Sequence, residues 1–186
     1  VVRARSARFA IAVLPACSNW QKLARQAEEF APDAVVIADE RWYGDLREAL
    51  AHLPVKVYAG TEAIEQVVRG DSADVVVNAL VGYAGMMPSL AAVETGKKLA
   101  LANKESLVIA GKQIIEAADR NGAAILPVDS EHSAIFQSLV GEVSPARRLI
   151  LTASGGPFLH TPKERLCEGT VEQALRHPNW SMGAKI

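Results

Sequence analysis

Between residues 8 and 152, short runs of aliphatic and β-branched residues alternate with longer segments in which apolar positions recur every three or four residues. The short runs are typical of buried strands, and the longer segments are typical of amphipathic helices. Their alternation predicts βαβ units and an α/β fold with a parallel sheet buried on both faces. The expected strands are 9–14, 34–38, 55–58, 75–79, 99–102, 123–126 and 148–152. The expected helices are 19–30, 45–53, 61–69, 88–95, 105–121 and 133–139.

Residues that favour helix ends support these boundaries. Small polar residues cap the amino ends of helices, proline is tolerated in the first turn, and glycine commonly follows the last turn. The sequence pattern changes after Val140, and two Thr-x-x-Glu/Gln capping boxes appear there. We place a domain boundary near Ala124, which gives domains 1–123 and 124–186. The expected end signals are Ser18 or Asn19, Thr61, Pro88 at the first helical position, Gly96, Gly122, and the boxes 161–164 and 170–173.

Length, composition and net charge limit the classes of protein to which this chain can belong. The chain has 186 residues, of which 49% are hydrophobic and 22% charged, with a net charge of −1, as in ordinary soluble globular proteins. This balance gives no electrostatic reason to expect binding to nucleic acid or to an anionic membrane. Cys17 and Cys167 are too few for a disulfide framework and lack zinc-site spacing, so we expect a reducing compartment. The amino end, which has neither Met nor a signal-peptide core, is expected to be a cut end.

Two carboxylates, Asp129 and Glu131, follow the apolar run 123–126 with Ser130 between them. In extended backbone, side chains two positions apart point the same way, so both carboxylates can bind one cation. Mg²⁺ and Mn²⁺ prefer such oxygen ligands. The alternative is structural, because Asp, Ser and Glu are also common at the start of a helix.

Other polar clusters follow the expected strands, where α/β proteins bind ligands. After the first strand, Ser18 and Asn19 precede a helix with no acid nearby, which suits the 2′-phosphate of NADP better than NAD; the alternative is a plain helix cap. Lys104 can bind a phosphate or an oxyanion, or it lies in a surface loop that Asn103 caps. The turn 154–156 resembles an anion-binding nest. Residues 177–183 are typical of a lid, or of a linker whose Trp180 packs on the core.

Four long motifs carry a family resemblance. They are LANKESLV at 101–108, PVDSEHSAIFQ at 127–137, LTASGGPF at 151–158 and HPNWSMG at 177–183. In sequence and order they resemble the 1-deoxy-D-xylulose 5-phosphate reductoisomerase family. The resemblance implies a Rossmann-like NADPH-binding domain followed by part of an α+β catalytic domain. It also implies isomerisation of 1-deoxy-D-xylulose 5-phosphate and its NADPH-dependent reduction to 2-C-methyl-D-erythritol 4-phosphate.

The resemblance implies roles for single residues. Asp129 and Glu131 bind Mg²⁺ or Mn²⁺, and Lys104 and His177 join them as catalytic groups. The implied substrate contacts are Lys104, Ser130, Glu131, Ser154, His177, Trp180 and Met182. The implied cofactor contacts are Cys17, Ser18, Asn19, Asn103, Glu105 and Gly183.

The chain departs from the family in several places. It lacks the family's glycine-rich loop, third acidic ligand and Asn-Lys pair, so we expect the 186 residues alone to be inactive. Cys17 stands where the family often has Gly, and Ala184 where a basic residue often follows the lid glycine. The resemblance implies a homodimer in the bacterial cytoplasm, with a plastid-type organelle left open. The rival interpretations are another NADP-dependent oxidoreductase, such as a homoserine-dehydrogenase-like enzyme, and a catalytically silent nucleotide- or anion-binding module.

Overall fold

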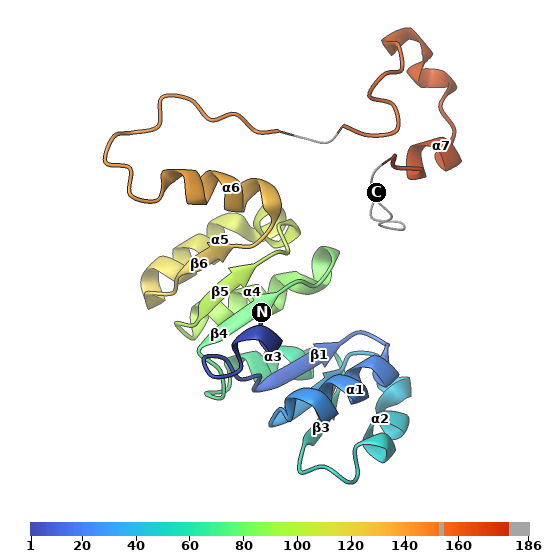
Figure 1. Ribbon diagram of the computed structural model, residues 1–186, viewed down its shortest axis with the longest axis vertical. Helices are drawn as coiled ribbons and strands as arrows, with labels where there is room; N and C mark the ends of the chain where they lie inside the picture. The colour runs from blue at the N-terminus through green and yellow to red at the C-terminus, as the bar shows by residue number, and fades with distance from the viewer. Residues whose placement is uncertain (153–154, 179–186) are drawn as a thin grey trace. The chain divides into compact units, whose positions relative to one another are not determined.

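The computed structural model describes residues 1–152 and 155–178 and divides into two compact units, Val1–Val140 and Gly141–Ile186 (Figure 1). The first unit carries every strand found in the described residues. It continues past the boundary expected near Ala124, because strand β6 pairs with strand β5 and helix α6 follows β6 directly. That expected boundary stays a prediction.

Six parallel strands form two three-stranded sheets in the first unit, which confirms the α/β prediction. The first sheet has the order β1 (Val13–Ala16), β2 (Ala34–Ile37) and β3 (Lys56–Ala59), and the second has β4 (Val75–Asn78), β5 (Lys98–Leu101) and β6 (Ile125–Pro127). The helices are α1 (Trp20–Phe30), α2 (Tyr43–Ala49), α3 (Thr61–Arg69), α4 (Met86–Glu94), α5 (Glu105–Asn121), α6 (Ser130–Leu139) and α7 (Val171–Leu175). Short 3₁₀ helices are η1 (Arg3–Arg5), η2 (Glu40–Trp42), η3 (Gly82–Gly85) and η4 (Lys163–Glu168).

Helices cover both faces of the first sheet. Val35 and Ile37 of β2 point to one face and pack in a core with apolar residues of α1 and α2. Val36 points to the other face and is also fully buried, and α3 contacts β2. A strand that is buried on both faces has apolar residues at every position, which explains the unbroken sequence Ala-Val-Val-Ile of β2.

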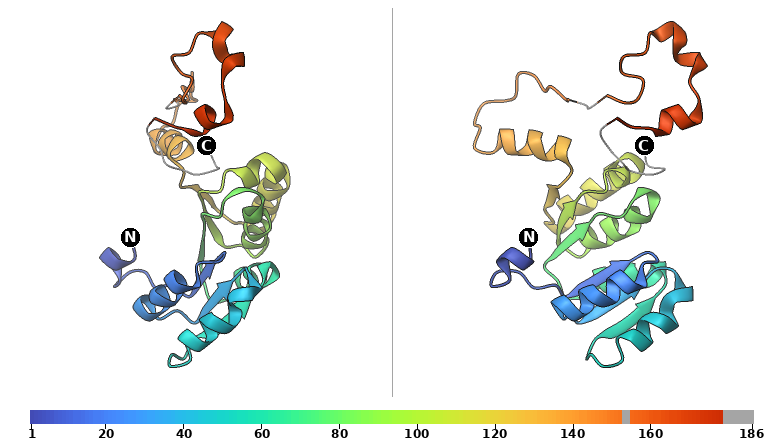
Figure 2. Two further views of the ribbon diagram at one scale, coloured as in Figure 1. Left: turned by 90° about the vertical axis from the view of Figure 1, so that its right-hand side faces the viewer. Right: turned by 45° about the vertical axis from the view of Figure 1, so that its right-hand side comes forward.

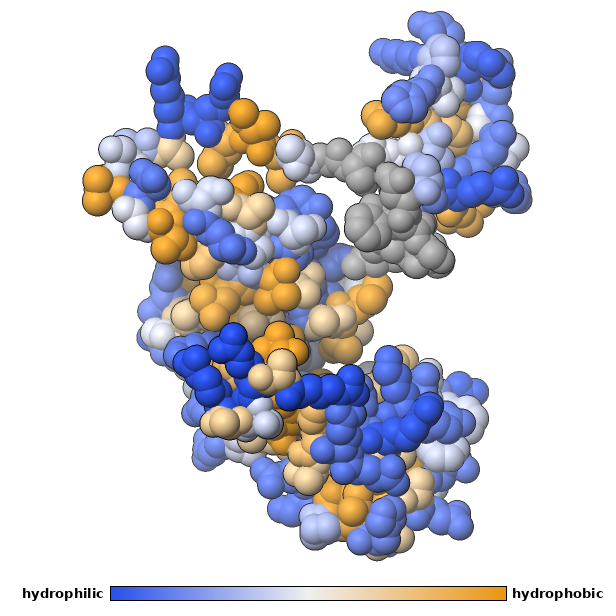
Figure 3. Space-filling view, viewed as in Figure 1, coloured by the Kyte–Doolittle hydropathy of each residue, from blue (hydrophilic) through white to orange (hydrophobic). Residues whose placement is uncertain are grey.

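The second sheet is covered differently. Leu99 and Leu101 of β5 pack against α4 and α5, and Figure 2 shows both helices on the same side of the sheet. Val77 of β4 points to the other face and is 68% exposed. Hydrophobic residues gather over these strands on the face that Figure 3 shows. The predicted burial on both faces is therefore wrong for this sheet within the described residues.

Two expected strands differ from the structure. The first begins at Val13 rather than at residue 9, because Val13 pairs with Ala34, where β2 itself begins, and residues 9–12 extend beyond that partner. Residues 148–152 form no strand. Their backbone has no strand partner among the described residues, and Ile150 stays 69% exposed. An apolar run alone does not make a strand when nothing pairs with its backbone groups.

Some helix-end predictions are confirmed. The Asn19 side chain caps α1 by accepting a hydrogen bond from the Lys22 backbone N–H, and Gly122 ends α5 with φ +65°. The Thr170–Gln173 capping box is present at α7. These ends depend only on local chain geometry, which the sequence encodes directly.

Other helix-end predictions are wrong. Gly60, with φ +94°, takes the cap position before α3, so Thr61 is the first helical residue and makes no cap bond. Helix α4 begins at Met86 because η3 runs directly into it, which leaves Pro88 inside the first turn. Proline is tolerated there since the N–H groups of the first turn have no partner within the helix. The box expected at 161–164 is absent because Pro162 holds the cap position of η4.

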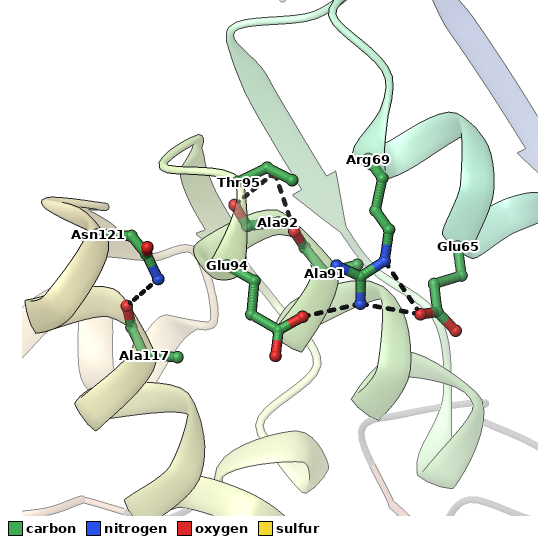
Figure 4. Close-up of polar contacts among 8 residues, drawn as sticks. All are labelled: Glu65, Arg69, Ala91, Ala92, Glu94, Thr95, Ala117 and Asn121. Carbon is green, nitrogen blue, oxygen red and sulfur yellow. Dashed lines mark hydrogen bonds and ion pairs between the residues drawn. The ribbon is translucent and has the colours of Figure 1, made fainter.

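Arg69 ties α3 to α4 (Figure 4). Its guanidinium donates to Glu65 Oε1 at 2.9 Å, one turn earlier on α3, and to Glu94 Oε2 at 2.7 Å on α4. Nearby, Lys97 Nζ donates to the carbonyl of Gly70 at 2.6 Å. Because α3 follows the first sheet and α4 packs on the second, these contacts join the two sheets within one unit. No described helix is both long and apolar enough to cross a bilayer.

Replacing Arg69 with Ala should lower the free energy of unfolding by about 1 kcal/mol, since two partly exposed ion pairs are lost. Urea unfolding followed by circular dichroism measures this change. The matched control is Lys112→Ala on α5, whose side chain is 82% exposed and lies 3.9 Å from Glu116. Equal midpoints for the two variants would show that the Arg69 pairs do not stabilise the unit.

Candidate active site

The candidate site lies where β5 and β6 end. Leu101 pairs with Pro127 in the parallel ladder, and the backbone N–H of Val128 donates to the Leu101 carbonyl at 2.9 Å. The segments that follow the two strands therefore leave from the same edge of the sheet. This arrangement brings Lys104 Nζ within 3.2 Å of Glu131 Oε2, although 27 positions separate the two residues.

Asp129 is the N-cap of α6. Its Oδ2 accepts a hydrogen bond from the His132 backbone N–H at 3.3 Å and lies 2.6 Å from His132 Nδ1. The Asp129 side chain is only 12% exposed. The helix-cap interpretation of Asp129 is therefore confirmed.

The extended geometry expected across Asp129, Ser130 and Glu131 is wrong. Asp129 has extended dihedral angles, but α6 begins at Ser130, three residues earlier than expected, and Glu131 lies in its first turn. The cap that Asp129 provides explains this early start. Any convergence of the two carboxylates is therefore set by the start of a helix and not by the alternation of a strand.

Charged and polar neighbours favour ionisation of both carboxyls. Burial tends to raise the pKa of Asp129, but hydrogen bonds from His132 and the positive charge of Lys104 outweigh it, so the pKa is lowered. The pKa of Glu131 is lowered first by its own backbone N–H and then by Lys104. Both carboxylates are therefore ionised at neutral pH and lie in the field of one ammonium group.

This donor set fits a hard divalent cation. Mg²⁺ commonly uses one or two protein carboxylates and completes its octahedron with water or substrate oxygens. Asp129 and Glu131 supply two ionised carboxylates, and ligating carboxylates are usually held by further hydrogen bonds, as His132 holds Asp129. Over residues 1–152 and 155–178 the structure has no group of three or more His, Cys, Asp or Glu side chains placed for a metal.

On the expected cofactor side, the turn after β1 exposes Cys17, Ser18 and Asn19. The Cys17 carbonyl accepts a hydrogen bond from the Asp39 backbone N–H at 2.9 Å, so an acid from the end of β2 lies beside this turn. Arg41 engages that carboxylate at 2.7 and 2.9 Å. Sequence reasoning missed Asp39, because only the β1–β2 pairing brings it close.

The alternative of a surface loop that Asn103 caps fits the structure, because Lys104 is exposed and the Ser106 backbone N–H donates to Asn103 Oδ1 at 3.0 Å. The Asn103 side chain itself is buried, at 1% exposure. Its amide nitrogen donates to the carbonyls of Leu80 and Gly82, and its Oδ1 accepts from the backbone N–H and the hydroxyl of Ser106. These four bonds use every hydrogen-bonding position of the side chain. The backbone N–H of Asn103 donates to the Asn78 carbonyl at 3.1 Å, so only the backbone carbonyl of Asn103 is left for the expected cofactor contact. Glu105, the next expected contact, begins α5.

The remaining expected site residues belong to the second unit. His177 is half-buried there, and Gly155 has φ +77° in the glycine turn. Ser154, Trp180, Met182 and Gly183 lie outside the described residues. Their roles stay predictions, as does the role of His177.

His132 is the main site residue that sequence reasoning left without a role. It stands three positions after Asp129, the spacing at which a side chain in the first helical turn faces the cap residue. That spacing was the signal available in the sequence. The structure adds the hydrogen bond between the ring and the Asp129 carboxylate.

The family model described as 1-deoxy-D-xylulose 5-phosphate reductoisomerase matches residues 1–111, and the model of its C-terminal domain matches residues 125–186. The chain belongs to this family. It is 53% identical over 178 residues to the reductoisomerase of Porphyromonas gingivalis, covering 96% of this chain and 46% of that protein. The Chlorobaculum tepidum enzyme is 48% identical over 187 residues, covering 100% and 49%. The chain thus spans about half the length of these curated relatives.

Solved structures show the same likeness. A DOX-P reductoisomerase in complex with NADPH, fosmidomycin and magnesium matches with a TM-score of 0.86 at 37% identity, covering 100% of this chain and 48% of that one. The Zymomonas mobilis enzyme in complex with NADPH matches with a TM-score of 0.86 at 41% identity, covering 95% and 47%. The family resemblance of the four motifs is therefore confirmed, and neither rival interpretation gains support.

Replacing Lys104 with Met should raise the pKa of Glu131 part of the way towards its ordinary value of about 4.3, because the ammonium is lost while the backbone N–H remains. Carboxyl chemical shifts followed through an acid titration measure it. Lys112→Met, on α5, is the control and should leave the Glu131 midpoint unchanged.

The same shift predicts a pH dependence of stability. Since the folded pKa of Glu131 lies below the unfolded value, its contribution is complete above about pH 4.3 and is lost as the pH falls through the folded pKa. Lys104→Met should lose part of this acid-range dependence. An identical Glu131 midpoint with and without Lys104 would contradict the ion pair in solution.

Proposed function

We propose that this chain supplies the cofactor-binding part and part of the catalytic site of an enzyme that isomerises 1-deoxy-D-xylulose 5-phosphate and reduces the product with NADPH to 2-C-methyl-D-erythritol 4-phosphate. Two observations support the proposal. Both family models match in order along the chain. The observation that carries it is the cluster in which Lys104 and Glu131 meet beside the capped, ionised Asp129.

In this proposal Asp129 and Glu131 hold Mg²⁺ or Mn²⁺, which supplies Lewis acidity to the substrate's oxygens when bound. The His132 ring keeps Asp129 oriented, because its Nδ1 lies 2.6 Å from the carboxylate. Lys104 places a positive charge beside the developing oxyanion, and Ser130 offers a hydroxyl at the start of α6. From the resemblance, Ser154 and His177 bind the phosphorylated substrate while Trp180 and Met182 exclude water.

The cofactor proposal is NADPH. Relatives in solved structures carry NADPH, and the described turn after β1 supports a 2′-phosphate through Ser18 and the start of the 11-residue helix α1. The neighbouring Asp39 is paired with Arg41, and a nearby arginine accommodates a 2′-phosphate in dinucleotide sites. We include Cys17, Asn19, Glu105, Gly183 and the backbone of Asn103 as further contacts. The homodimer and the cytoplasmic location stay predictions.

The decisive experiment replaces the segment of the Chlorobaculum tepidum enzyme that matches this chain with the chain itself. If the proposal holds, the chimera oxidises NADPH only when 1-deoxy-D-xylulose 5-phosphate and Mg²⁺ or Mn²⁺ are both present. NADH should support turnover at least about tenfold less efficiently. A folded chimera that binds NADPH but never consumes it would leave only a nucleotide-binding function.

Within this chimera, Asp129→Asn should lower kcat/KM about a hundredfold or more, because a neutral amide is a poor ligand for a hard cation. The apparent Mn²⁺ affinity should fall in the same variant, which isothermal titration calorimetry can measure. Asp119→Asn, at an exposed position of α5, is the matched control and should change neither value. Unchanged Mn²⁺ affinity in Asp129→Asn would remove Asp129 from the metal site.

The 186 residues alone should show no reductoisomerase activity with NADPH and Mn²⁺ supplied. They correspond to about half of each relative, and catalytic groups that act as a unit lose most of their effect when some are missing. Absorbance of NADPH at 340 nm tests this in protein purified from a host that lacks the enzyme. Substrate-dependent NADPH loss would mean that these 186 residues suffice for catalysis.

A further inference from the structure

Four buried polar side chains lie at the carboxyl ends of β4 and β5, beside an otherwise apolar core. Asn78 ends β4, Ser89 lies on α4, Asn103 follows β5, and Ser106 lies in the first turn of α5. Their exposed fractions are 3%, 0%, 1% and 0%. Burying such side chains costs free energy unless every polar group has a hydrogen-bond partner. The network that the four residues form is therefore constrained to keep each of its members paired.

The first half of the network holds the start and the end of the loop between β4 and α4. The Asn78 amide donates to the Gly85 carbonyl and to Ser89 Oγ, each at 2.7 Å, and its Oδ1 accepts from the Leu80 backbone N–H at 3.1 Å. The Ser89 hydroxyl lies 2.9 Å from the same Gly85 carbonyl. The main chain of residues 80–85 is thus bonded to side chains and not to another strand.

The second half holds the same loop to α5. Asn103 donates to the carbonyls of Leu80 and Gly82 and accepts from Ser106, while the hydroxyls of Ser89 and Ser106 lie 3.3 Å apart. One side chain therefore binds both the loop and the first turn of α5. The residue between that side chain and the helix is Lys104.

Gly85 is required by space and not by backbone conformation. Its φ is −81°, which any residue can adopt. A Cβ atom there would lie 2.4 Å from Cγ of Asn103, closer than van der Waals contact allows. Asn103 cannot turn aside without giving up buried hydrogen bonds. Any side chain at position 85 must therefore displace Asn103.

We propose that Asn78, Ser89, Asn103 and Ser106 are positioning residues that, with Gly85, hold Lys104 beside Glu131. Lys104 directly follows Asn103, so its backbone is held by the network while its ammonium reaches Glu131 at 3.2 Å. None of the four is proposed to touch substrate or cofactor through its side chain. The inference concerns the geometry of the chain itself and does not depend on the proposed reaction.

The test compares Gly85→Ala with Gly44→Ala in the 186-residue chain. A Cβ at Gly44, on α2, would meet no atom within 4 Å, so this variant controls for the substitution itself. The readout is the rate at which an amine-reactive reagent labels Lys104 in the native state, measured by mass spectrometry and referred to Lys112. Gly85→Ala should speed Lys104 labelling about two- to fivefold, as expected when an exposed ion pair is lost, and Gly44→Ala should not.

The double variant Asn103→Ala/Gly85→Ala separates positioning from general destabilisation. If Gly85 exists to accommodate Asn103, adding Gly85→Ala to Asn103→Ala should change Lys104 labelling by less than about 1.5-fold, because the clash has gone. An undiminished effect of Gly85→Ala in that background would overturn the proposal.

Variants that remove less material guard against failure to fold. Ser89→Ala and Ser106→Ala each delete one hydroxyl and leave the packing volume nearly unchanged. Both should speed Lys104 labelling relative to Lys112 while the far-ultraviolet circular dichroism stays that of the parent chain. Folded Ser89→Ala, Ser106→Ala and Gly85→Ala chains that all label Lys104 at the parent rate would show that the network does not position it.

Discussion

The parallel pairing of β5 with β6 is the constraint on which the candidate site depends. It places the ends of two strands, Leu101 and Pro127, side by side, so that the loop carrying Lys104 and the helix carrying Glu131 leave from one edge. A shift of the register would separate these residues, whatever their own chemistry. The apolar core that fixes this register is formed by Leu99 and Leu101 with α4 and α5. The packing of α4 and α5 against the sheet therefore determines which charged groups meet at its edge.

Asp129 combines two roles that often compete. As the N-cap of α6 it accepts a backbone hydrogen bond, and as a partly buried carboxylate it is kept ionised by His132 and Lys104. A cap holds the side chain in one orientation, which is what a metal ligand also requires. The structural and the functional interpretations of this residue are thus compatible, and the helix start supplies the rigidity that a loop carboxylate would lack.

The loop at residues 80–85 is held in place by side chains and not by strand pairing. It has no strand partner, yet its main chain is held at four points by the side chains of Asn78 and Asn103. Such a network is stable only when every member is satisfied, so it tolerates few substitutions. Position 85 is an example of this low tolerance. Asn103 already occupies the space that a side chain there would fill, so the position is glycine. The chain next to the exposed Lys104 is therefore held by buried groups.

Much of this protein was determined by its sequence. The apolar runs identified all six strands of the two sheets, and local signals such as Asn19 and Gly122 identified helix ends, because both depend on short stretches of chain. The long motifs around Lys104 and Asp129 identified the family. The tertiary structure alone decided which polar groups meet. Asp39 beside Cys17, Lys104 beside Glu131 and Asn103 within its buried network all depend on strand pairing and packing between distant segments. The strand expected at 148–152 failed for the same physical reason, since an extended apolar segment becomes a strand only when another one bonds to it.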